Sequence, residues 1–310
     1  MKSGSQNQLR KGSSFISEIA HVSRVATERI LGKPSSAEEG KVTPSSPIGV
    51  FDSGVGGLTV LKELMRQLPH EDVIYFADTA RVPYGNRPPE EILAFNREII
   101  PFLIKRGAKL IIMACGTSSS IAYPVVKDEF PVYLVSLIEP GARAALSATR
   151  RGRIGVIATA GTVNSGAYEK TLRSINSDII VTSQACPLFV PLIEGGHLEG
   201  EEVRRAVKEC LTPVLTQKID TLILGCTHYP HLAKVIREVA GPEITLIDPA
   251  GEAVAEAKAL LKKFKTIKQT ADQPNYTYLT TGQPRPFQEL GTKLLGKTIA
   301  KAIMVNLPLK

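Results

Sequence analysis

Two apolar runs that each stop at a cysteine restrict the fold of this chain more than any other feature. Residues 108–122 read AKLIIMACGTSSSIA, and residues 221–230 read TLILGCTHYP. Each run has the length of a buried parallel strand and is followed by small hydroxyl residues. Parallel strands of α/β proteins present functional side chains at the carboxyl edge of their sheet. The sequence therefore predicts that Cys115 and Cys226 lie at two such strand ends.

The rest of the chain alternates short apolar segments with stretches of helical spacing. The predicted strands besides the two above are 48–52, 73–77, 132–136, 154–158, 179–182 and 244–248. This alternation predicts an α/β fold with mostly parallel sheets flanked by helices. The second half loosely repeats the first, so we expect two pseudo-symmetric domains with an active site in the cleft between them.

The net charge of +8 is concentrated in residues 1–46 and 257–310, and the remainder is slightly acidic. No nucleic-acid partner is expected, because basic ends are usually solvated surface. Residues 1–46 are rich in Ser, Gly, Gln and Lys and predict a disordered extension outside the fold. A plastid transit peptide is the minor alternative, which Glu18 and Glu28 oppose. No apolar run approaches the length of a membrane span.

The four cysteines show no CxxC spacing and follow no secretory signal. We therefore expect free thiols in a reducing, cytoplasmic compartment and no disulfide framework. Cys186, beside a proline, and Cys210, in a charged helical stretch, are expected to be inert. Cys115 and Cys226 are therefore the two thiols that we expect to react.

A pair of thiols on opposite faces of one carbon is what a racemase without a cofactor needs. One sulfur, as thiolate, removes the α-proton, and the other, as thiol, supplies a proton from the opposite side. Each cysteine needs a helper, because a free thiol is only slightly ionised near neutral pH. His228, two residues after Cys226, and Asp52, at the end of strand 48–52, are placed to help. Donors to the developing carbanion are expected from Ser53, Thr117, Ser118, Thr227 and backbone N–H groups.

Other interpretations of these residues stay open at this point. The glycine-rich turn 53–57 suits either an anion at a helix start or a tight structural turn. His228 suits a core position or, with Cys226 and His231, a metal site, although the second ligand cluster typical of zinc sites is missing. Three acidic residues at strand ends or loop starts are expected to cap helices without touching substrate, namely Asp78, Glu139 and Asp248.

The chain resembles the glutamate racemase family, within the aspartate/glutamate racemase superfamily, from about Pro47 to its end. The motifs that carry the resemblance occur in the family's order and include IGVFDSGVGGLTVLKEL, YFADTARVPYG, IEPGARAA, ACPLFVPLIEGG, LGCTHYP and YLTTGQP. The resemblance implies interconversion of L- and D-glutamate without cofactor or metal, for peptidoglycan synthesis. It also implies a first domain of residues 47–137 and 249–310 and a second of residues 138–248. We expect a homodimer that needs neither nucleic acid nor membrane.

The resemblance also implies a role for each matching residue. Cys115 takes the α-proton of the D-enantiomer with help from Asp52. Cys226 takes that of the L-enantiomer with help from His228 and Glu194. The implied substrate-binding residues are Asp52, Ser53, Pro83, Tyr84, Gly85, Thr117, Ser118 and Thr227.

One position departs from the family pattern. The family usually has Cys-Asn-Thr where this chain has Cys115-Gly116-Thr117, and loss of the Asn hydrogen bond is expected to weaken substrate binding by about 1–3 kcal/mol. Two alternative functions stay open, of which Gly116 favours the second. One is a racemase for aspartate or another amino acid, and the other is an amino-acid-binding protein with impaired catalysis.

Overall fold

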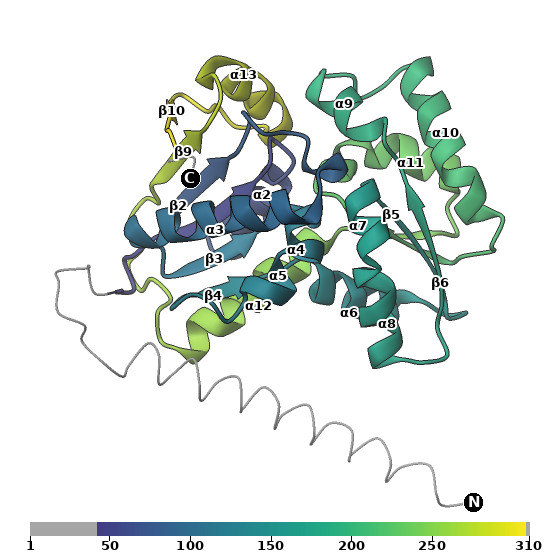
Figure 1. Cartoon of the computed structure of the whole chain (residues 1–310), viewed down its shortest axis with the longest axis horizontal. Helices are drawn as coiled ribbons and strands as arrows, with labels where there is room; N and C mark the ends of the chain where they lie inside the picture. The colour runs from purple at the N-terminus through teal and green to yellow at the C-terminus, as the bar shows by residue number, and fades with distance from the viewer. Residues whose placement is uncertain (1–41, 308–310) are drawn as a thin grey trace, which may run out of the picture.

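The structure, a computed structural model, describes residues 42–307 and contains two α/β units side by side (Figure 1). The predicted fold class is confirmed, since the strands form two parallel sheets. The larger sheet consists, in spatial order, of β10 (Ala302–Met304), β9 (Tyr276–Thr280), β2 (Val73–Ala77), β1 (Ile48–Asp52), β3 (Leu110–Met113) and β4 (Tyr133–Val135). The smaller sheet consists of β6 (Ile180–Ala185), β5 (Arg153–Ala158), β7 (Thr221–Leu224) and β8 (Thr245–Ile247).

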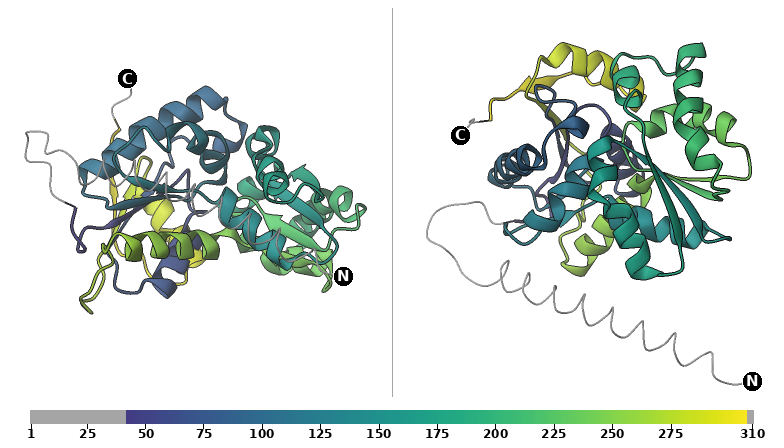
Figure 2. Two further views of the ribbon diagram at one scale, coloured as in Figure 1. Left: turned by 90° about the horizontal axis from the view of Figure 1, so that it is seen from below. Right: turned by 45° about the vertical axis from the view of Figure 1, so that its right-hand side comes forward.

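Helices connect the strands and cover the faces of both sheets (Figure 2). Around the larger sheet lie α2 (Leu58–Gln67), the 3₁₀ turn η1 (Tyr84–Asn86), α3 (Pro89–Lys105), α4 (Gly116–Ile121), α5 (Tyr123–Val126), α12 (Pro249–Lys263) and α13 (Pro284–Leu295). Around the smaller sheet lie α6 (Ile138–Ala148), α7 (Ala160–Ser165), α8 (Ala167–Ile175), α9 (Phe189–Glu194), α10 (Glu201–Leu215), the 3₁₀ turn η2 (Tyr229–Leu232) and α11 (Ala233–Ala240).

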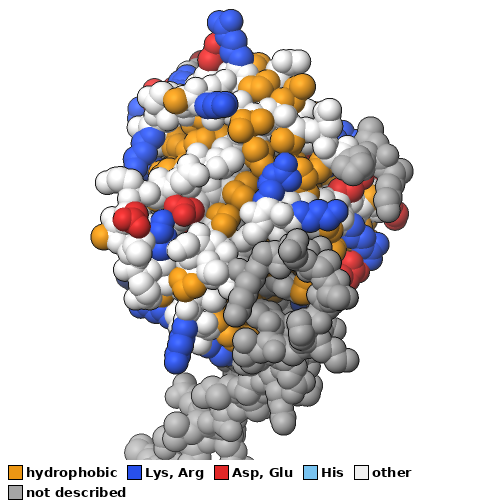
Figure 3. Space-filling model, turned by 90° about the vertical axis from the view of Figure 1, so that its left-hand side faces the viewer, with side chains coloured by type: hydrophobic (Ala, Val, Ile, Leu, Met, Phe, Trp, Pro, Cys, Tyr) orange, Lys and Arg blue, Asp and Glu red, His pale blue; other side chains and the backbone are white. Residues whose placement is uncertain are grey.

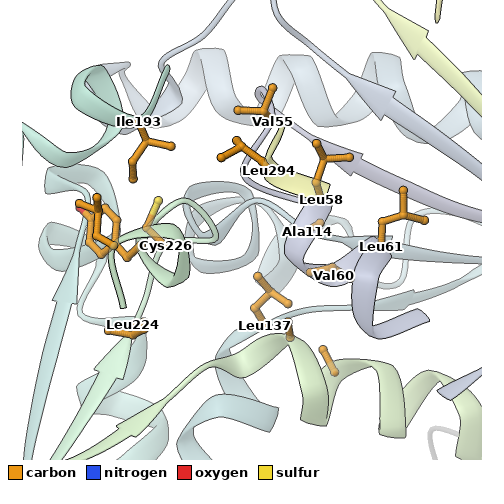
Figure 4. Packing of buried hydrophobic residues seen from close by; sticks show 14 of the residues in the cluster. Val55, Leu58, Val60, Leu61, Ala114, Leu137, Ile193, Leu224, Cys226 and Leu294 are labelled. Carbon is orange, nitrogen blue, oxygen red and sulfur yellow. The ribbon is translucent and has the colours of Figure 1, made fainter. Parts of the chain in front are cut away.

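The central strands are buried along their whole length because helices cover both of their faces. Every residue of β1, β2 and β3 is buried, as expected for strands of a covered parallel sheet. One apolar cluster runs from α2 of the larger sheet to Leu224 and Cys226 of the smaller one. Figure 4 shows part of this cluster, with Val55 on one side and Ile193 on the other. Burial of this shared core stabilises the association of the two sheets.

The chain crosses between the sheets twice. It leaves the larger sheet through α6, after β4, and returns through α12, after β8. Helix α12 packs against both α2 and α6. We propose that the domain limits predicted from the sequence, 47–137 with 249–310 and 138–248, apply to the two sheets. The predicted extension 1–46 lies outside the described residues except for 42–46, and the segment considered as an alternative transit peptide lies wholly outside them.

The cysteines differ from the sequence-based expectation. Cys115 and Cys226 are free and buried, but Cys186 and Cys210 form a disulfide, with Cα atoms 5.6 Å apart. The expectation of free thiols is therefore wrong for this pair. The cause is tertiary packing: α10 contacts β6 and α9, on either side of Cys186, and the side chain of Cys210 is buried. A separation of 24 residues gives no sign of such a contact.

One of the two edge strands of the larger sheet is β10. Its Ile303 and Met304 are exposed, and Figure 3 shows hydrophobic side chains gathered among Lys and Arg on this side of the molecule. The strand is only three residues long, which limits pairing with a further strand. The homodimer stays a prediction.

Among residues 42–307, no helix combines the length and apolar character needed to cross a membrane.

Candidate active site

In each sheet, the first strand of the chain lies between the next two, so the strand order reverses at that strand. In the larger sheet, β1 lies between β2 and β3, and in the smaller sheet, β5 lies between β6 and β7. Open α/β sheets bind ligands beyond the carboxyl ends of their strands at such a switch point. Asp52 ends β1 and Cys115 follows β3, while Thr159 follows β5 and Cys226 follows β7. Both thiols thus lie at the switch points of their sheets.

The two switch points meet at one small cavity between the sheets. Its volume is about 10 Å³, roughly the space that a single water molecule needs. An amino acid is larger than this volume, so the cavity has to widen before one binds. The cavity is lined by Asp52, Ser53, Pro83, Tyr84, Gly85, Cys115, Gly116, Thr117, Thr159, Val190, Cys226, Thr227 and His228.

Two predicted site residues, Ser118 and Glu194, do not line this cavity. Ser118 lies one step behind it and accepts a hydrogen bond from Asn96 Nδ2 at 3.1 Å. Glu194 lies behind His228 and contacts its imidazole. Their predicted roles remain predictions.

Two lining residues, Thr159 and Val190, were missed by the sequence analysis. Thr159 directly follows β5, so its strand-end position was an available signal. Its hydroxyl lies 3.0 Å from that of Thr117, across the boundary between the sheets. Val190 belongs to an apolar segment, in which a lining residue has no signal that separates it from a core residue.

A histidine–glutamate pair stands beside Cys226. The Nδ1 atom of His228 lies 3.7 Å from Cys226 Sγ, and its Nε2 lies 2.8 Å from Glu194 Oε1. Burial lowers the pKa of His228, but the hydrogen bonds to Cys226 and Glu194 outweigh burial and raise it well above its ordinary value. Burial raises the pKa of Glu194, yet the contacts with His228 bring it below its ordinary value. An imidazolium paired with a carboxylate therefore faces the Cys226 sulfur.

The surroundings of Cys115 have the opposite electrical character. Its Sγ lies 4.0 Å from Ser53 Oγ, and Ser53 Oγ donates to Asp52 Oδ1 at 3.2 Å. Burial, followed by the negative charge of Asp52, raises the pKa of the Cys115 thiol to about 12. Burial also raises the pKa of Asp52, against the opposing effect of His228. Cys115 is therefore a neutral thiol at rest, with a carboxyl group reachable through Ser53.

This difference predicts how Cys115 reacts with an alkylating reagent. In a Cys226→Ser variant, the rate of Cys115 alkylation should rise about tenfold per pH unit between about pH 7 and 10, because the thiolate fraction rises in that proportion below the thiol pKa. Peptide mass mapping after iodoacetamide treatment measures this rate. A plateau below about pH 9 would contradict the raised pKa of Cys115.

The glycine-rich turn of the larger sheet packs directly on the histidine–glutamate pair. A Cβ atom at Gly54 would overlap Glu194 Oε1, and one at Gly56 would overlap His228 Nδ1. The backbone N–H of Gly54 donates to Asp52 Oδ1 at 3.0 Å, and that of Val55 lies 3.4 Å from Glu194 Oε1. Both interpretations of this turn therefore apply, since it is a tight turn whose N–H groups contact carboxylates of the protein itself.

Among residues 42–307, no group of three or more His, Cys, Asp or Glu side chains is arranged to hold a metal ion. The alternative metal set of Cys226, His228 and His231 is not formed. His231 lies on η2, and its Nε2 is buried without a hydrogen-bond partner.

Gly116 lies in close contact with the backbone that precedes Cys226. A Cβ atom at this position would overlap the backbone carbonyl oxygen of Gly225, next to Cys226. The missing side chain therefore permits contact between the sheets, in addition to removing an amide. We expect Gly116→Ala to lower kcat/KM by tenfold to a hundredfold, because overpacking of this contact costs about 1–3 kcal/mol in the closed state.

A Gly116→Asn variant separates the two effects of the glycine. The close contact predicts a loss at least as large as that of Gly116→Ala, whereas a site limited only by the missing amide would gain activity. Gly251→Ala is the matched control, since a Cβ there meets no atom nearer than Glu63 Oε2 at 3.8 Å. Steady-state kinetics of the three variants measures these outcomes, and unchanged kinetics of Gly116→Ala would contradict the steric role.

The chain is similar to known proteins over most of its length. Residues 48–257 match the family model described as Asp/Glu/Hydantoin racemase. A glutamate racemase of Geobacter metallireducens is 43% identical over 264 residues, which cover 85% of this chain and 98% of that protein. The crystal structure of a glutamate racemase from Bacillus anthracis is 38% identical, covers 86% of this chain and 99% of its own, and superposes with a TM-score of 0.82.

A glutamate racemase structure from Francisella tularensis in complex with D-glutamate gives a similar result. It is 38% identical, with a TM-score of 0.80, and covers 86% of this chain and 99% of its own. The match thus extends over both sheets and the helices between them. The match to the family model and to these relatives shows that the chain belongs to the Asp/Glu/Hydantoin racemase family.

Proposed function

We propose that this protein is a glutamate racemase that interconverts L- and D-glutamate with two cysteines and no cofactor. The observation that carries the proposal is one cavity bordered by Cys115 and Cys226, two free thiols from different sheets. The activity named for the relatives supports glutamate as the substrate. The product D-glutamate would be used in peptidoglycan synthesis, and we expect a cytoplasmic homodimer.

In the L-to-D direction, the Cys226 thiolate removes the α-proton of L-glutamate and becomes a thiol. The electron pair of the broken C–H bond remains on the α-carbon, next to the carboxylate. The Cys115 thiol then gives its proton to the opposite face of that carbon and becomes a thiolate. The D-to-L direction reverses each step, so that inversion follows from the placement of the sulfurs on opposite sides.

The helper groups match these roles. The imidazolium of His228 is held by Glu194 and lies beside Cys226, where its positive charge stabilises a thiolate. Asp52, whose pKa is raised by burial, can take the proton of Cys115 through Ser53. With L-glutamate as substrate, Cys226 is therefore assigned the role of base and Cys115 the role of acid.

The developing negative charge next to the substrate carboxylate needs hydrogen-bond donors that are already in place. The hydroxyls of Ser53, Thr117 and Thr227 line the cavity. Thr227 Oγ1 donates to Asp52 Oδ2 at 3.1 Å, which links the two sheets at the base of the site. Before substrate arrives, the hydroxyl protons of Ser53 and Thr227 are directed to Asp52, so each hydroxyl has to turn in order to donate to the substrate.

A substrate panel tests the proposed function. Purified full-length protein is incubated with L-glutamate, L-aspartate and other L-amino acids, and the enantiomers are separated by chiral chromatography. We expect D-glutamate to form until the two enantiomers are equal in amount. Turnover of aspartate in preference to glutamate would identify a different racemase. Binding of glutamate without turnover would identify an amino-acid-binding protein.

A further inference from the structure

The proposed reaction leaves one fully buried carboxylate without a role. Asp78 follows β2, and 0% of its surface is exposed. The sequence suggested that Asp78 caps a helix, for which it would accept a hydrogen bond from a backbone N–H group. Instead, its carboxylate accepts hydrogen bonds from three side chains. Arg81 Nε donates to Oδ2 at 2.6 Å, Thr281 Oγ1 donates to Oδ1 at 2.7 Å, and the Tyr84 hydroxyl also donates to Oδ2.

These partners come from two distant parts of the chain. Arg81 and Tyr84 belong to the loop 79–87 after β2, whereas Thr281 directly follows β9 near the carboxyl end of the chain. Arg81 is fixed further by Glu98, at 2.6 Å from its Nη1. Asp78 therefore joins the loop to the end of β9.

A second set of hydrogen bonds reinforces this junction. The hydroxyls of Thr79 and Thr280 lie 2.6 Å apart. The backbone N–H of Ala80 donates to Thr281 Oγ1 at 3.0 Å, and that of Gly282 donates to Thr79 Oγ1 at 2.9 Å. The motifs YFADTARVPYG and YLTTGQP are thus two halves of one structure, although about 200 residues separate them in the sequence.

The loop held in this way borders the cavity. Pro83, Tyr84 and Gly85 line it, but the Tyr84 hydroxyl is directed to Asp78. Burial and then the charge of Asp78 raise the pKa of Tyr84 well above its ordinary value, so this hydroxyl stays a donor. A Cβ atom at Gly85 would lie 2.6 Å from Thr159 Cβ, which places the loop in close contact with the smaller sheet.

We propose that Asp78 and Thr281 are positioning residues, which fix the loop 79–87 against the end of β9 and so hold Pro83, Tyr84 and Gly85 at the substrate. The proposal rests on the proposed glutamate racemase function for its kinetic part. The reacting thiols and their helpers lie on other elements. Loss of the anchor should therefore weaken substrate binding more than it slows the chemical step.

The test compares Thr281→Val, which removes the hydroxyl at similar volume, with Thr281→Ser, which keeps it. We expect Thr281→Val to raise KM for glutamate about tenfold, with kcat changed less than threefold, and Thr281→Ser to restore KM to within about threefold of the original value. Hydrogen exchange of the peptide 79–87 in the full-length protein should be faster in Thr281→Val by about tenfold. Thr292→Val is the matched control, because Thr292 Oγ1 also accepts a backbone N–H, from Ile299 at 3.0 Å, but away from the loop.

Each outcome bears on a different claim. Unchanged exchange of 79–87 in Thr281→Val would overturn the anchor, whatever the substrate is. Faster exchange with an unchanged KM would overturn its role in substrate binding. Equal effects of Thr281→Val and Thr292→Val would also overturn the proposal, since both would then act through stability alone. Absence of glutamate racemisation in the unmodified protein would instead contradict the proposed function, and the exchange experiment would still decide the anchor.

Discussion

Replacement of either Cys115 or Cys226 by serine is expected to lower racemisation of glutamate by about 10³-fold or more. A positioned acid or base typically contributes about 10²–10⁴-fold to a proton transfer, and an alcohol ionises far less readily than a thiol. The loss should be equal in both directions, because the two enantiomers have the same free energy and the ratio of their kcat/KM values is therefore fixed. Chiral chromatography from each enantiomer measures both rates.

The fold should survive these two substitutions, since sulfur and oxygen differ little in size. Circular dichroism and the melting temperature check this point. Cys210→Ser is a matched substitution outside the cavity, on α10, and should keep racemisation within about threefold, even though it removes the disulfide with Cys186. Substantial racemisation by Cys115→Ser or Cys226→Ser would refute the assignment of that cysteine.

Replacement of Glu194 by glutamine is expected to lower kcat/KM by about 10²-fold and to change its pH dependence. The hydrogen bonds of His228 to Cys226 and Glu194 hold its pKa well above the ordinary value. Activity that needs the imidazolium is present below this pKa and is lost as the pH rises through it. Removal of the Glu194 charge lowers the pKa of His228. The basic limb of the pH profile should therefore move to lower pH.

The matched control for this prediction is Glu199→Gln. Glu199 forms an exposed ion pair with Lys234, at 3.0 Å, and such surface pairs contribute little. Its pH profile should match that of the unmodified protein. A basic limb that stays in place in Glu194→Gln would contradict the role of the histidine–glutamate pair.

Much of the fold, and the edge of the sheet at which the site lies, could be predicted from the sequence because they depend on local patterns. The apolar runs that end at Cys115 and Cys226 predict buried parallel strands, and β3 and β7 are such strands. Since side chains at the ends of parallel strands share one edge of a sheet, Asp52 and Cys115 were expected on the same edge. The cavity contains both.

Features that depend on contacts between distant segments were beyond prediction. The disulfide of Cys186 with Cys210 depends on how α10 packs beside β6. The role of Asp78 depends on a strand that the chain reaches only at residue 276. The sequence identified Gly116 as a missing amide, but only the structure shows its contact with the carbonyl group of Gly225.

The central claim is that two sulfurs act on opposite faces of one carbon, and racemisation in heavy water tests it most directly. L-Glutamate is incubated with the full-length protein in deuterated buffer, and both enantiomers are analysed by mass spectrometry at low conversion. The account predicts that the D-glutamate formed carries solvent deuterium at its α-carbon while the recovered L-glutamate keeps its original hydrogen. D-Glutamate that retains the original hydrogen would show that a single group removes and returns the same proton, and would contradict the account.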